Sequence, residues 1–216
     1  MCGRIVQIDP SKIQKEYKPW NPKFKDQIPL FRANYNGAPS QDFAVYAQDG
    51  LSLMRFGLVP SWSKTFETQF STINARIETL DDSRLYAPIV KKNRGLLPVQ
   101  GFYEWKKEAD GKQPYFIHLK DKPLFAMACI WSSWYDKDET EHRSFSIITR
   151  PPGKIMHSIH DREPAYIAKK DEDNWLGEYD KKFLEEPEDQ LESWAVTKDV
   201  NRPANNNAAL IKRFEI

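Results

Sequence analysis

Short runs of hydrophobic and polar residues with β propensity, separated by turn signals, dominate the first two thirds of the chain. Asp49-Gly50 and Asp110-Gly111 are typical of tight turns between antiparallel strands. They predict two hairpins, formed by residues 44–48 with 51–56 and by residues 104–107 with 115–119. Further strands are predicted at residues 2–8, 125–130, 144–149, 165–167 and 191–196. The pattern therefore favours a mainly antiparallel β structure.

The helical signals are short and scattered between the predicted strands. Asp81 or Asp82 can cap a helix that runs to about Lys92. Its inner face would carry Leu85, Ile89 and Val90. Weaker helices are predicted at residues 11–17, 154–159 and 172–176. No internal repeat or linker divides the chain, so these elements predict one α+β domain over residues 1–216.

Composition supports a folded core and leaves room for a charged partner. Of the residues, 40% are hydrophobic and 13% are aromatic, which suits a β-rich core or a surface that stacks on flat partners. The net charge is +1, but residues 171–192 hold ten acidic side chains against two lysines, so the remainder carries +9. That remainder can present a local phosphate-binding face. The alternative is that both charge runs are ordinary solvated surfaces.

Two cysteines suggest a reducing compartment. Cys129 lies in the apolar run of residues 124–131 and is predicted to be a small buried hydrophobe. No signal-peptide pattern and no membrane-spanning apolar stretch is present, so we expect a bacterial-type cytoplasmic location with no membrane partner. Cys2 is then a free thiol.

Cys2 directly follows the initiator methionine, and methionine aminopeptidases act when the second residue is small. Removal of Met1 leaves a 1,2-aminothiol on Cys2. The α-amine has a reference pKa of about 7.7 to 8.0, so a useful fraction is neutral near pH 7. This amine can form a Schiff base with an aldehyde, and the neighbouring thiol can then close a thiazolidine ring. A chance position of one cysteine is the competing interpretation.

Other polar residues stand in apolar or turn-like segments. Asn74 and Arg76 share a face if residues 72–79 are extended. Glu104 stands between two aromatic residues and, if buried, is a candidate for proton transfer. His160 is a candidate acid or base. No histidine lies in a motif with metal-ligand spacing, so neither a metal nor a small-molecule cofactor is expected.

Six motifs occur together in a fixed order. They are Met1-Cys2-Gly3-Arg4, Tyr35-Asn36-Gly37-Ala38-Pro39-Ser40-Gln41, Phe56-Gly57-Leu58-Val59-Pro60-Ser61-Trp62, Asn74-Ala75-Arg76, Gly101-Phe102-Tyr103-Glu104-Trp105 and His160-Asp161-Arg162. In this order they resemble the motifs of the SOS-response-associated peptidase (SRAP) domain family. The resemblance implies a compact α+β fold with a β-barrel-like core, short peripheral helices and a groove for single-stranded DNA.

The resemblance also implies a function in the DNA damage response. The N-terminal cysteine would crosslink to a ring-opened abasic site in single-stranded DNA, by lyase-like Schiff-base chemistry, on a protein that is nucleoid-associated when bound to DNA. Cys2 would be the nucleophile, Asn74 would hold the sugar and Cys2, Glu104 would move protons for the amine, and His160 would act on the sugar oxygens. Four residues would contact the DNA strand: Arg4, Arg76 and Arg162 at phosphates, and Trp62 by stacking on or wedging between bases. A core position is the alternative for Trp62.

Four positions depart from the family pattern. Phe56 replaces a usual Trp, Gly95 a frequent Cys and Glu163 a usual Met, and Asn36-Gly37 is atypical in its motif. Glu163 beside Arg162 would be expected to weaken DNA affinity.

Two other functions fit the same residues. One is an N-terminal-nucleophile cysteine peptidase, autoprotease or amidase that uses Cys2. The other is a non-covalent module for modified or single-stranded DNA, in which Cys2 is incidental. Multiple turnover on peptides would favour the first, and binding without an adduct would favour the second.

Overall fold

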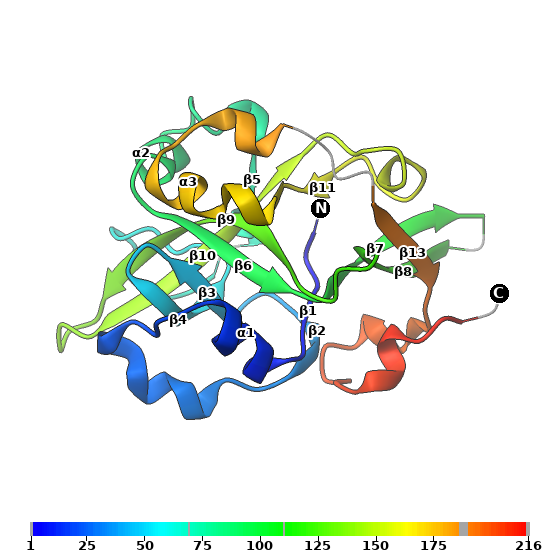
Figure 1. Ribbon diagram of the computed structural model, residues 1–216, viewed down its shortest axis with the longest axis horizontal. Helices are drawn as coiled ribbons and strands as arrows, with labels where there is room; N and C mark the ends of the chain where they lie inside the picture. The colour runs from blue at the N-terminus through cyan, green and yellow to red at the C-terminus, as the bar shows by residue number, and fades with distance from the viewer. Residues whose placement is uncertain (1, 69, 110, 186–189, 215–216) are drawn as a thin grey trace.

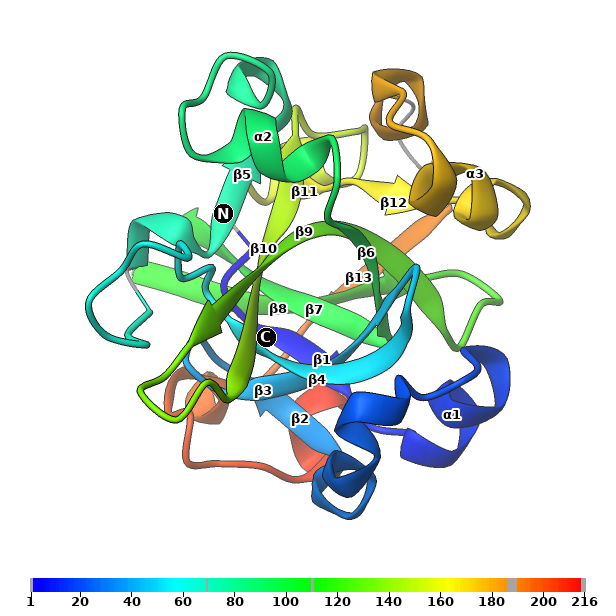
Figure 2. The same cartoon turned by 90° about the vertical axis from the view of Figure 1, so that its left-hand side faces the viewer.

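Five strands close into a barrel, and a second sheet packs beside it. The computed structural model describes residues 2–68, 70–109, 111–185 and 190–214. The barrel strands are β3 (Asp42–Ala47), β4 (Gly50–Phe56), β6 (Arg94–Val99), β9 (Phe125–Tyr135) and β10 (Glu141–Arg150). They pair in the order β10, β4, β3, β6, β9, and β9 pairs back onto β10, so the ring seen in Figure 2 is closed. The expected single compact domain with a barrel core is thus confirmed.

The second sheet carries the start of the chain. Its order is β13 (Leu191–Ala195), β8 (Gly111–Leu119), β7 (Gly101–Glu108), β1 (Ile5–Gln7) and β2 (Asn34–Gly37). β1 pairs antiparallel with β7 and with β2. Figure 1 shows the chain entering between the barrel and this sheet. Cys2, directly before β1, therefore lies where the two sheets meet.

Three short strands extend the barrel wall near this junction. β5 (Asn74–Arg76) runs parallel to β10, with Asn74 opposite Ile147. β11 (Glu163–Pro164) pairs with the end of β10, and β12 (Tyr166–Ile167) pairs with β9. The segments around residues 74 and 163 are therefore brought to the same strand, although 89 positions separate them in the sequence.

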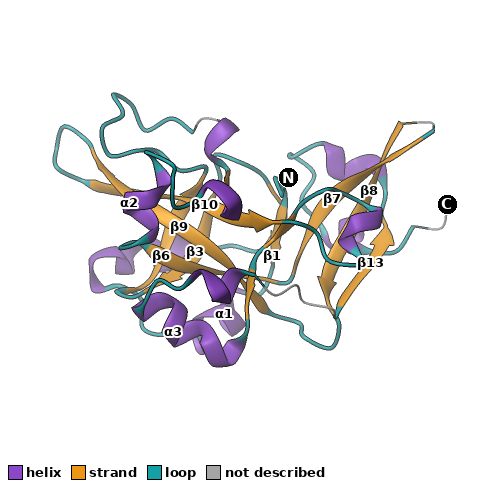
Figure 3. Cartoon of the chain, turned by 90° about the horizontal axis from the view of Figure 1, so that it is seen from above, coloured by secondary structure: helices purple, strands orange, loops and turns teal. Residues whose placement is uncertain are grey.

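The helices lie outside the strands (Figure 3). The α-helices are α1 (Pro10–Glu16), α2 (Tyr86–Val90) and α3 (Glu172–Gly177). The 3₁₀ segments are η1 (Pro22–Leu30), η2 (Phe70–Thr72), η3 (Ile77–Thr79), η4 (Met156–Ser158), η5 (Lys169–Asp171), η6 (Lys181–Leu184), η7 (Lys198–Asn201) and η8 (Ala208–Ile211). Within the described ranges, no helix is long and apolar enough to cross a membrane.

The predicted helices are mostly confirmed in position, but one differs in type and one in its N-terminal cap. The helices predicted at residues 11–17 and 172–176 are confirmed as α1 and α3, whereas residues 154–159 form only the 3₁₀ turn η4. The predicted cap was wrong: α2 starts at Tyr86, and the Ser83 hydroxyl accepts from its backbone N–H at 3.2 Å. Asp81 instead accepts a hydrogen bond from Tyr179 at 2.7 Å, so tertiary contact outweighs its capping preference.

The predicted strands and both hairpins are present. β3 and β4 close at the pair Ala47 and Gly50. β7 pairs with β8, and Asp110 of their turn lies outside the described residues. β2 and β6 were missed. β6 is buried along its whole length, so it lacks the alternation that marks a half-buried strand, and it contains a proline.

Packing explains three of the four departures from the family pattern. Phe56 is buried and stacks on Phe145, with ring centroids 5.2 Å apart. A β-carbon on Gly95 would approach Cys129 Sγ and Val45 Cγ1 at 3.0 Å, so a larger residue there would require these buried neighbours to shift by a few tenths of an ångström. A β-carbon on Gly37 would lie 2.3 Å from the Phe43 ring, which requires glycine there.

Asn36 ties the C-terminal segment to the second sheet. It is fully buried, and its Nδ2 donates to the carbonyls of Val200 at 3.1 Å, Arg202 at 2.9 Å and Asn205 at 2.9 Å. Its Oδ1 accepts from Arg4 Nη1 at 2.6 Å. Of the three acceptor residues, Val200 is buried, and a buried carbonyl that loses its donor costs roughly 1–3 kcal/mol, so this one side chain helps to hold η7 in place.

We expect Asn36→Ala to lower the free energy of unfolding by about 2 to 4 kcal/mol, because it leaves buried polar groups unpaired. Denaturant unfolding measures this loss, and hydrogen exchange should show faster opening of residues 199–205. Asn206→Ala is the matched control and should have little effect, because it removes only two exposed hydrogen bonds, one accepted from the Tyr35 N–H at 2.7 Å and one donated to the Ala33 carbonyl at 3.5 Å. Equal stability of the two variants would contradict the assignment.

Candidate active site and nucleic-acid interface

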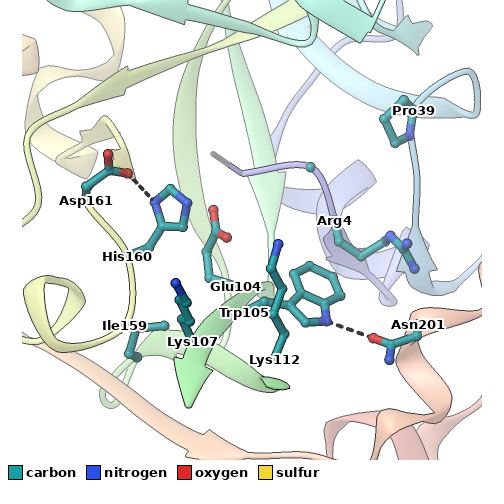
Figure 4. Close-up of a pocket in the computed structure, with 11 residues that line it drawn as sticks. Arg4, Pro39, Glu104, Trp105, Lys107, Lys112, Ile159, His160, Asp161 and Asn201 are labelled. Atoms are coloured by element: carbon teal, nitrogen blue, oxygen red, sulfur yellow. Dashed lines mark hydrogen bonds and ion pairs between the residues drawn. The ribbon is translucent and has the colours of Figure 1, made fainter. Parts of the chain in front are cut away.

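A cleft of about 720 Å³ opens where the second sheet meets the η4 loop and η7 (Figure 4). Its lining residues are Gly3, Arg4, Pro39, Glu104, Trp105, Lys107, Lys112, Ile159, His160, Asp161 and Asn201. A second hollow of about 560 Å³ continues from it and shares Lys107 and His160. The lining holds more cationic than anionic side chains, which suits an anionic chain running through both hollows.

Cys2 lies directly beside this cleft, before Gly3 and Arg4. It is fully buried and its thiol is free. Burial raises the pKa of the Cys2 thiol well above its usual value, and the nearby negative charge of Glu104 raises it further. The thiol is therefore neutral at neutral pH.

Asn74 fixes the backbone of Cys2. Its Nδ2 donates to the Cys2 carbonyl and to the Ile73 carbonyl, both at 3.0 Å. Its Oδ1 is buried and has no hydrogen-bond partner among the described residues. Tyr86 holds the backbone of Asn74 in turn, since its hydroxyl donates to the Asn74 carbonyl at 3.3 Å. The Nδ2 of Asn74 is therefore held by two carbonyls, and its Oδ1 is left to accept a further hydrogen bond.

Glu104 and His160 project into the same cleft from different elements (Figure 4). Glu104, on β7, is only 3% exposed, so the expected burial is confirmed. His160 follows η4, and its Nδ1 accepts from the Arg162 backbone N–H at 3.1 Å. Asp161 Oδ1 lies 2.9 Å from the same nitrogen and can pair with the ring when it is protonated. Both protonation states of His160 thus have a partner, as an acid–base residue requires.

The three predicted arginine contacts have different surroundings. Arg4 lines the cleft, while its Nη1 also donates to the Val200 carbonyl at 2.8 Å. Arg76, at the end of β5, is exposed and forms no ion pair within the described residues. Of the three, Arg76 has the guanidinium most available to a strand.

Arg162 is buried and already paired. Its guanidinium contacts both carboxylate oxygens of Glu78, at 2.5 and 2.9 Å, and Nη2 donates to the Thr149 carbonyl at 2.7 Å. The hydrogen bond from Arg162 lowers the pKa of Glu78. A phosphate contact by Arg162 would require this pair to open, and it stays a prediction.

Trp62 is 69% exposed, so the alternative of a core tryptophan was wrong. Its loop is nevertheless held in place. Phe66 stacks on Trp134 with centroids 5.6 Å apart, and Trp134 Nε1 donates to the Ser63 carbonyl at 2.8 Å. The structure therefore presents the Trp62 ring to solvent on an anchored loop, as a stacking residue requires.

Glu163 follows Arg162 in the sequence but its side chain points inward, so the weaker DNA affinity expected from it stays a prediction. It is fully buried and accepts from Arg150 Nε at 2.9 Å and from the Gly153 N–H at 2.8 Å. Its charge is compensated by Arg150 and does not face the cleft. Among the described residues, no group of histidine, cysteine and acidic side chains could hold a metal ion.

Sequence reasoning missed several cleft residues. Lys107 and Lys112 face each other across β7 and β8, and a run of lysines flanking a turn is too common to single them out. Trp105 Nε1 donates to Asn201 Oδ1 at 2.7 Å. Asn201 reaches the site only because the C-terminal segment folds back, so no local signal could have found it.

No described residue of the acidic segment is among those that line the cleft. Its described part docks on the barrel through Trp175, which is fully buried and donates to the Gly95 carbonyl at 3.1 Å. Arg94 Nε donates to the Trp175 carbonyl at 2.6 Å. Residues 171–185 therefore cover the barrel and are not part of the cleft lining, while Glu192 lies on β13 of the second sheet.

The sequence of this chain is similar to a known protein family and to known proteins. The family described as SOS response associated peptidase (SRAP) matches residues 1–203. Abasic site processing protein YoaM of Bacillus subtilis is 34% identical, over 98% of this chain and 97% of the relative. Abasic site processing protein YedK of Escherichia coli is 30% identical, over 82% of this chain and 79% of the relative.

A solved structure agrees with this result at the level of the fold. A protein from Bacteroides thetaiotaomicron, with 24% identity, superposes with a TM-score of 0.86 and covers 99% of this chain and 100% of its own. The ordered motifs, the barrel with its second sheet and the match over residues 1–203 lead to one conclusion: the chain belongs to the SRAP family.

Proposed function

We propose that this protein captures abasic sites in single-stranded DNA covalently, through a thiazolidine formed on Cys2 once Met1 has been removed. The observation that carries the proposal is the position of Cys2, beside a cleft into which both Glu104 and His160 project. Asn74 holds its carbonyl at 3.0 Å. Relatives at 30% and 34% identity are named abasic site processing proteins, which supports abasic DNA as the target.

The raised pKa of the Cys2 thiol supports an order of events in which the α-amine reacts first. A neutral, buried thiol is a poor first nucleophile, whereas a free α-amine near its reference pKa is partly neutral and reactive. The amine attacks the aldehyde, water leaves, and a Schiff base forms. The thiol then adds to the imine carbon, and both nucleophiles of one residue end in one ring.

Glu104 and His160 divide the proton transfers. An abasic sugar is mainly a closed hemiacetal, so a group that gains and loses a proton must act on its ring oxygen. His160 suits this step because its Nδ1 has an N–H donor and a carboxylate within 3.1 Å. Glu104 suits the removal of a proton from the Cys2 ammonium, since its charge already acts on Cys2. The open Oδ1 of Asn74 can accept from a sugar hydroxyl.

The strand would follow the basic side of the cleft. Lys107 and Lys112 line it, and the exposed Arg76 offers a further phosphate contact. Trp62 is available to stack on a base. The cleft lining includes none of the described residues of the acidic segment.

A peptidase function is less well supported. A cysteine that attacks an amide first needs thiolate character, which positive neighbours or a lowered pKa provide. Burial and Glu104 act in the opposite direction on Cys2. Aldehyde capture, which starts from the amine, fits these surroundings better.

The first prediction tests the two nucleophiles of Cys2. Cys2→Ala, and a form that retains Met1, should give no stable adduct with abasic single-stranded DNA, because one lacks the thiol and the other the Cys2 amine. Cys2→Ser should give only a Schiff base that borohydride can trap. Denaturing electrophoresis and intact mass measure both products.

Cys129→Ala is the matched control, because Cys129 is equally buried and lies in the barrel. It should crosslink as the unaltered chain does. An unreduced, denaturation-stable crosslink on Cys2→Ala would contradict the proposal. Repeated turnover of peptides without an aldehyde adduct would favour the peptidase alternative.

The second prediction compares Arg76 with Arg162. Arg76→Ala should weaken capture of abasic single strands and flatten its salt dependence by about 0.7 per lost phosphate contact. Reaction with a small free aldehyde should be unchanged. Arg162→Ala should instead lower the free energy of unfolding by about 1–2 kcal/mol, because it breaks a partly exposed pair with Glu78.

Salt titrations of binding and denaturant unfolding distinguish these effects. An unchanged salt slope in Arg76→Ala would assign this residue to structure. A flattened slope in Arg162→Ala at full stability would show that the Glu78 pair opens on binding.

The third prediction separates Glu104 from His160 in single-turnover rates. Glu104→Gln should slow adduct formation most at low pH, where the amine is protonated and needs a base. His160→Ala should slow adduct formation with the abasic site by about 10²-fold or more, but it should slow the reaction with an open-chain aldehyde much less. Equal slowing of both substrates by His160→Ala would move His160 to the imine step or to the fold.

A further inference from the structure

Tyr166 is a buried tyrosine whose hydroxyl has no hydrogen-bond partner among the described residues. The side chain lies on β12 and is 7% exposed. A buried hydroxyl without a partner costs free energy, so such a group calls for an explanation. None of the steps described above uses it.

The packing of Tyr166 places it on the reactive side of the second sheet. Its ring lies 6.5 Å from the Phe102 ring and 5.6 Å from the Phe125 ring. Phe102 and Glu104 are two residues apart on β7, so both side chains face the same side of the sheet. Cys2 belongs to the same hydrophobic cluster as Tyr166. Tyr166 therefore sits in the apolar layer that surrounds Cys2 and faces Glu104.

A charged pair is built against the Tyr166 ring. The Arg150 guanidinium lies 5.3 Å from the ring centroid and pairs with Glu163 at 2.9 Å. Both side chains are almost completely buried, at 2% and 0% exposure. Burial raises the pKa of Tyr166 well above its usual value, and Glu163 adds to this effect. The phenol therefore keeps its proton and can only act as a donor toward an anion.

We propose that Tyr166 is a positioning residue for ring closure, in which its hydroxyl donates a hydrogen bond to the Cys2 sulfur as the thiazolidine forms. This inference rests on the proposed function. During closure the sulfur–carbon bond forms, the π electrons of the C=N bond move to nitrogen, and the thiol proton passes to that nitrogen. Tyr166 keeps its own proton and stabilises the negative charge that develops on sulfur. The Tyr166 hydroxyl would thus gain its acceptor only when negative charge develops on the Cys2 sulfur.

The test compares Tyr166→Phe with Tyr103→Phe in the chain that lacks Met1. Tyr166→Phe keeps the ring contacts and removes only the unpartnered hydroxyl. Tyr103 is a matched control because it is also a buried tyrosine, but it packs in a different cluster and its hydroxyl donates to the Tyr35 carbonyl at 2.8 Å. Acetaldehyde is the probe, since it has no ring to open and makes no phosphate contact.

Borohydride quenching followed by intact mass separates the two products, because the imine is reduced and the thiazolidine is not. In Tyr166→Phe we expect imine formation at the unaltered rate and ring closure slowed about tenfold or more, as for loss of a hydrogen bond to a charged group. The pH at which closure reaches half its maximal rate should rise. Tyr103→Phe should change neither quantity.

The pH profiles of the two variants can be compared directly, because both keep the same charged groups around residue 166. The charged groups that face it are Glu104 on β7, Arg150 on β10 and Glu163 on β11, and both variants retain all three. Thermal unfolding of Tyr166→Phe should occur at or above the unaltered temperature, because the lost hydroxyl had no partner. A purely structural role predicts a lower temperature and an unshifted pH profile.

Closure at the unaltered rate and pH in Tyr166→Phe would overturn the inference, and so would equal slowing of imine formation and closure. Slowed closure with acetaldehyde supports it even if the unaltered chain fails to capture abasic DNA. That last result would overturn the proposed function alone.

Discussion

The hydrogen bond from Asn74 to the Cys2 carbonyl joins the two halves of the molecule beside the candidate site. Asn74 belongs to β5, which is paired to the barrel strand β10, while Cys2 leads into β1 of the second sheet. Chain termini usually fray because little holds their backbone. Here the start of the chain is paired on both edges of β1 and tied to the barrel by Asn74, so Cys2 is held in a defined position.

Several buried polar groups around the site are satisfied by fixed partners, and a few are left open. Arg150 pairs with Glu163. Arg162, which is also buried, pairs with the partly exposed Glu78. Among the described residues the open groups include Asn74 Oδ1 and Tyr166 Oη, both in the surroundings of Cys2, and also Nε of Arg4 and of Arg162. Buried groups without partners lower stability, and proteins tolerate that cost where activity requires it. Their location next to the reactive residue fits this relation.

The arginines expected to contact DNA also differ in whether their side chains have fixed partners. Arg4 is anchored by Asn36 and the C-terminal segment, whereas Arg76 is exposed. An anchored guanidinium gives a fixed direction, and a free one can adapt to a flexible strand. The two arginines can therefore contribute differently to the same interface.

The sequence by itself determined the strands with clear turns, one compact domain with a barrel core, the family and the reactive types of residue. These depend on local signals, such as the Asp49-Gly50 turn, or on short ordered motifs. It did not reveal β6, whose two buried faces erase the alternating pattern. Only the tertiary structure decided that Trp62 is exposed, that Arg162 is committed to Glu78, that Asn201 lines the cleft and that Tyr166 packs in the same hydrophobic cluster as Cys2. Those facts arise from contacts between segments far apart in the chain, and burial and pairing at such contacts leave no local trace in the order of residues.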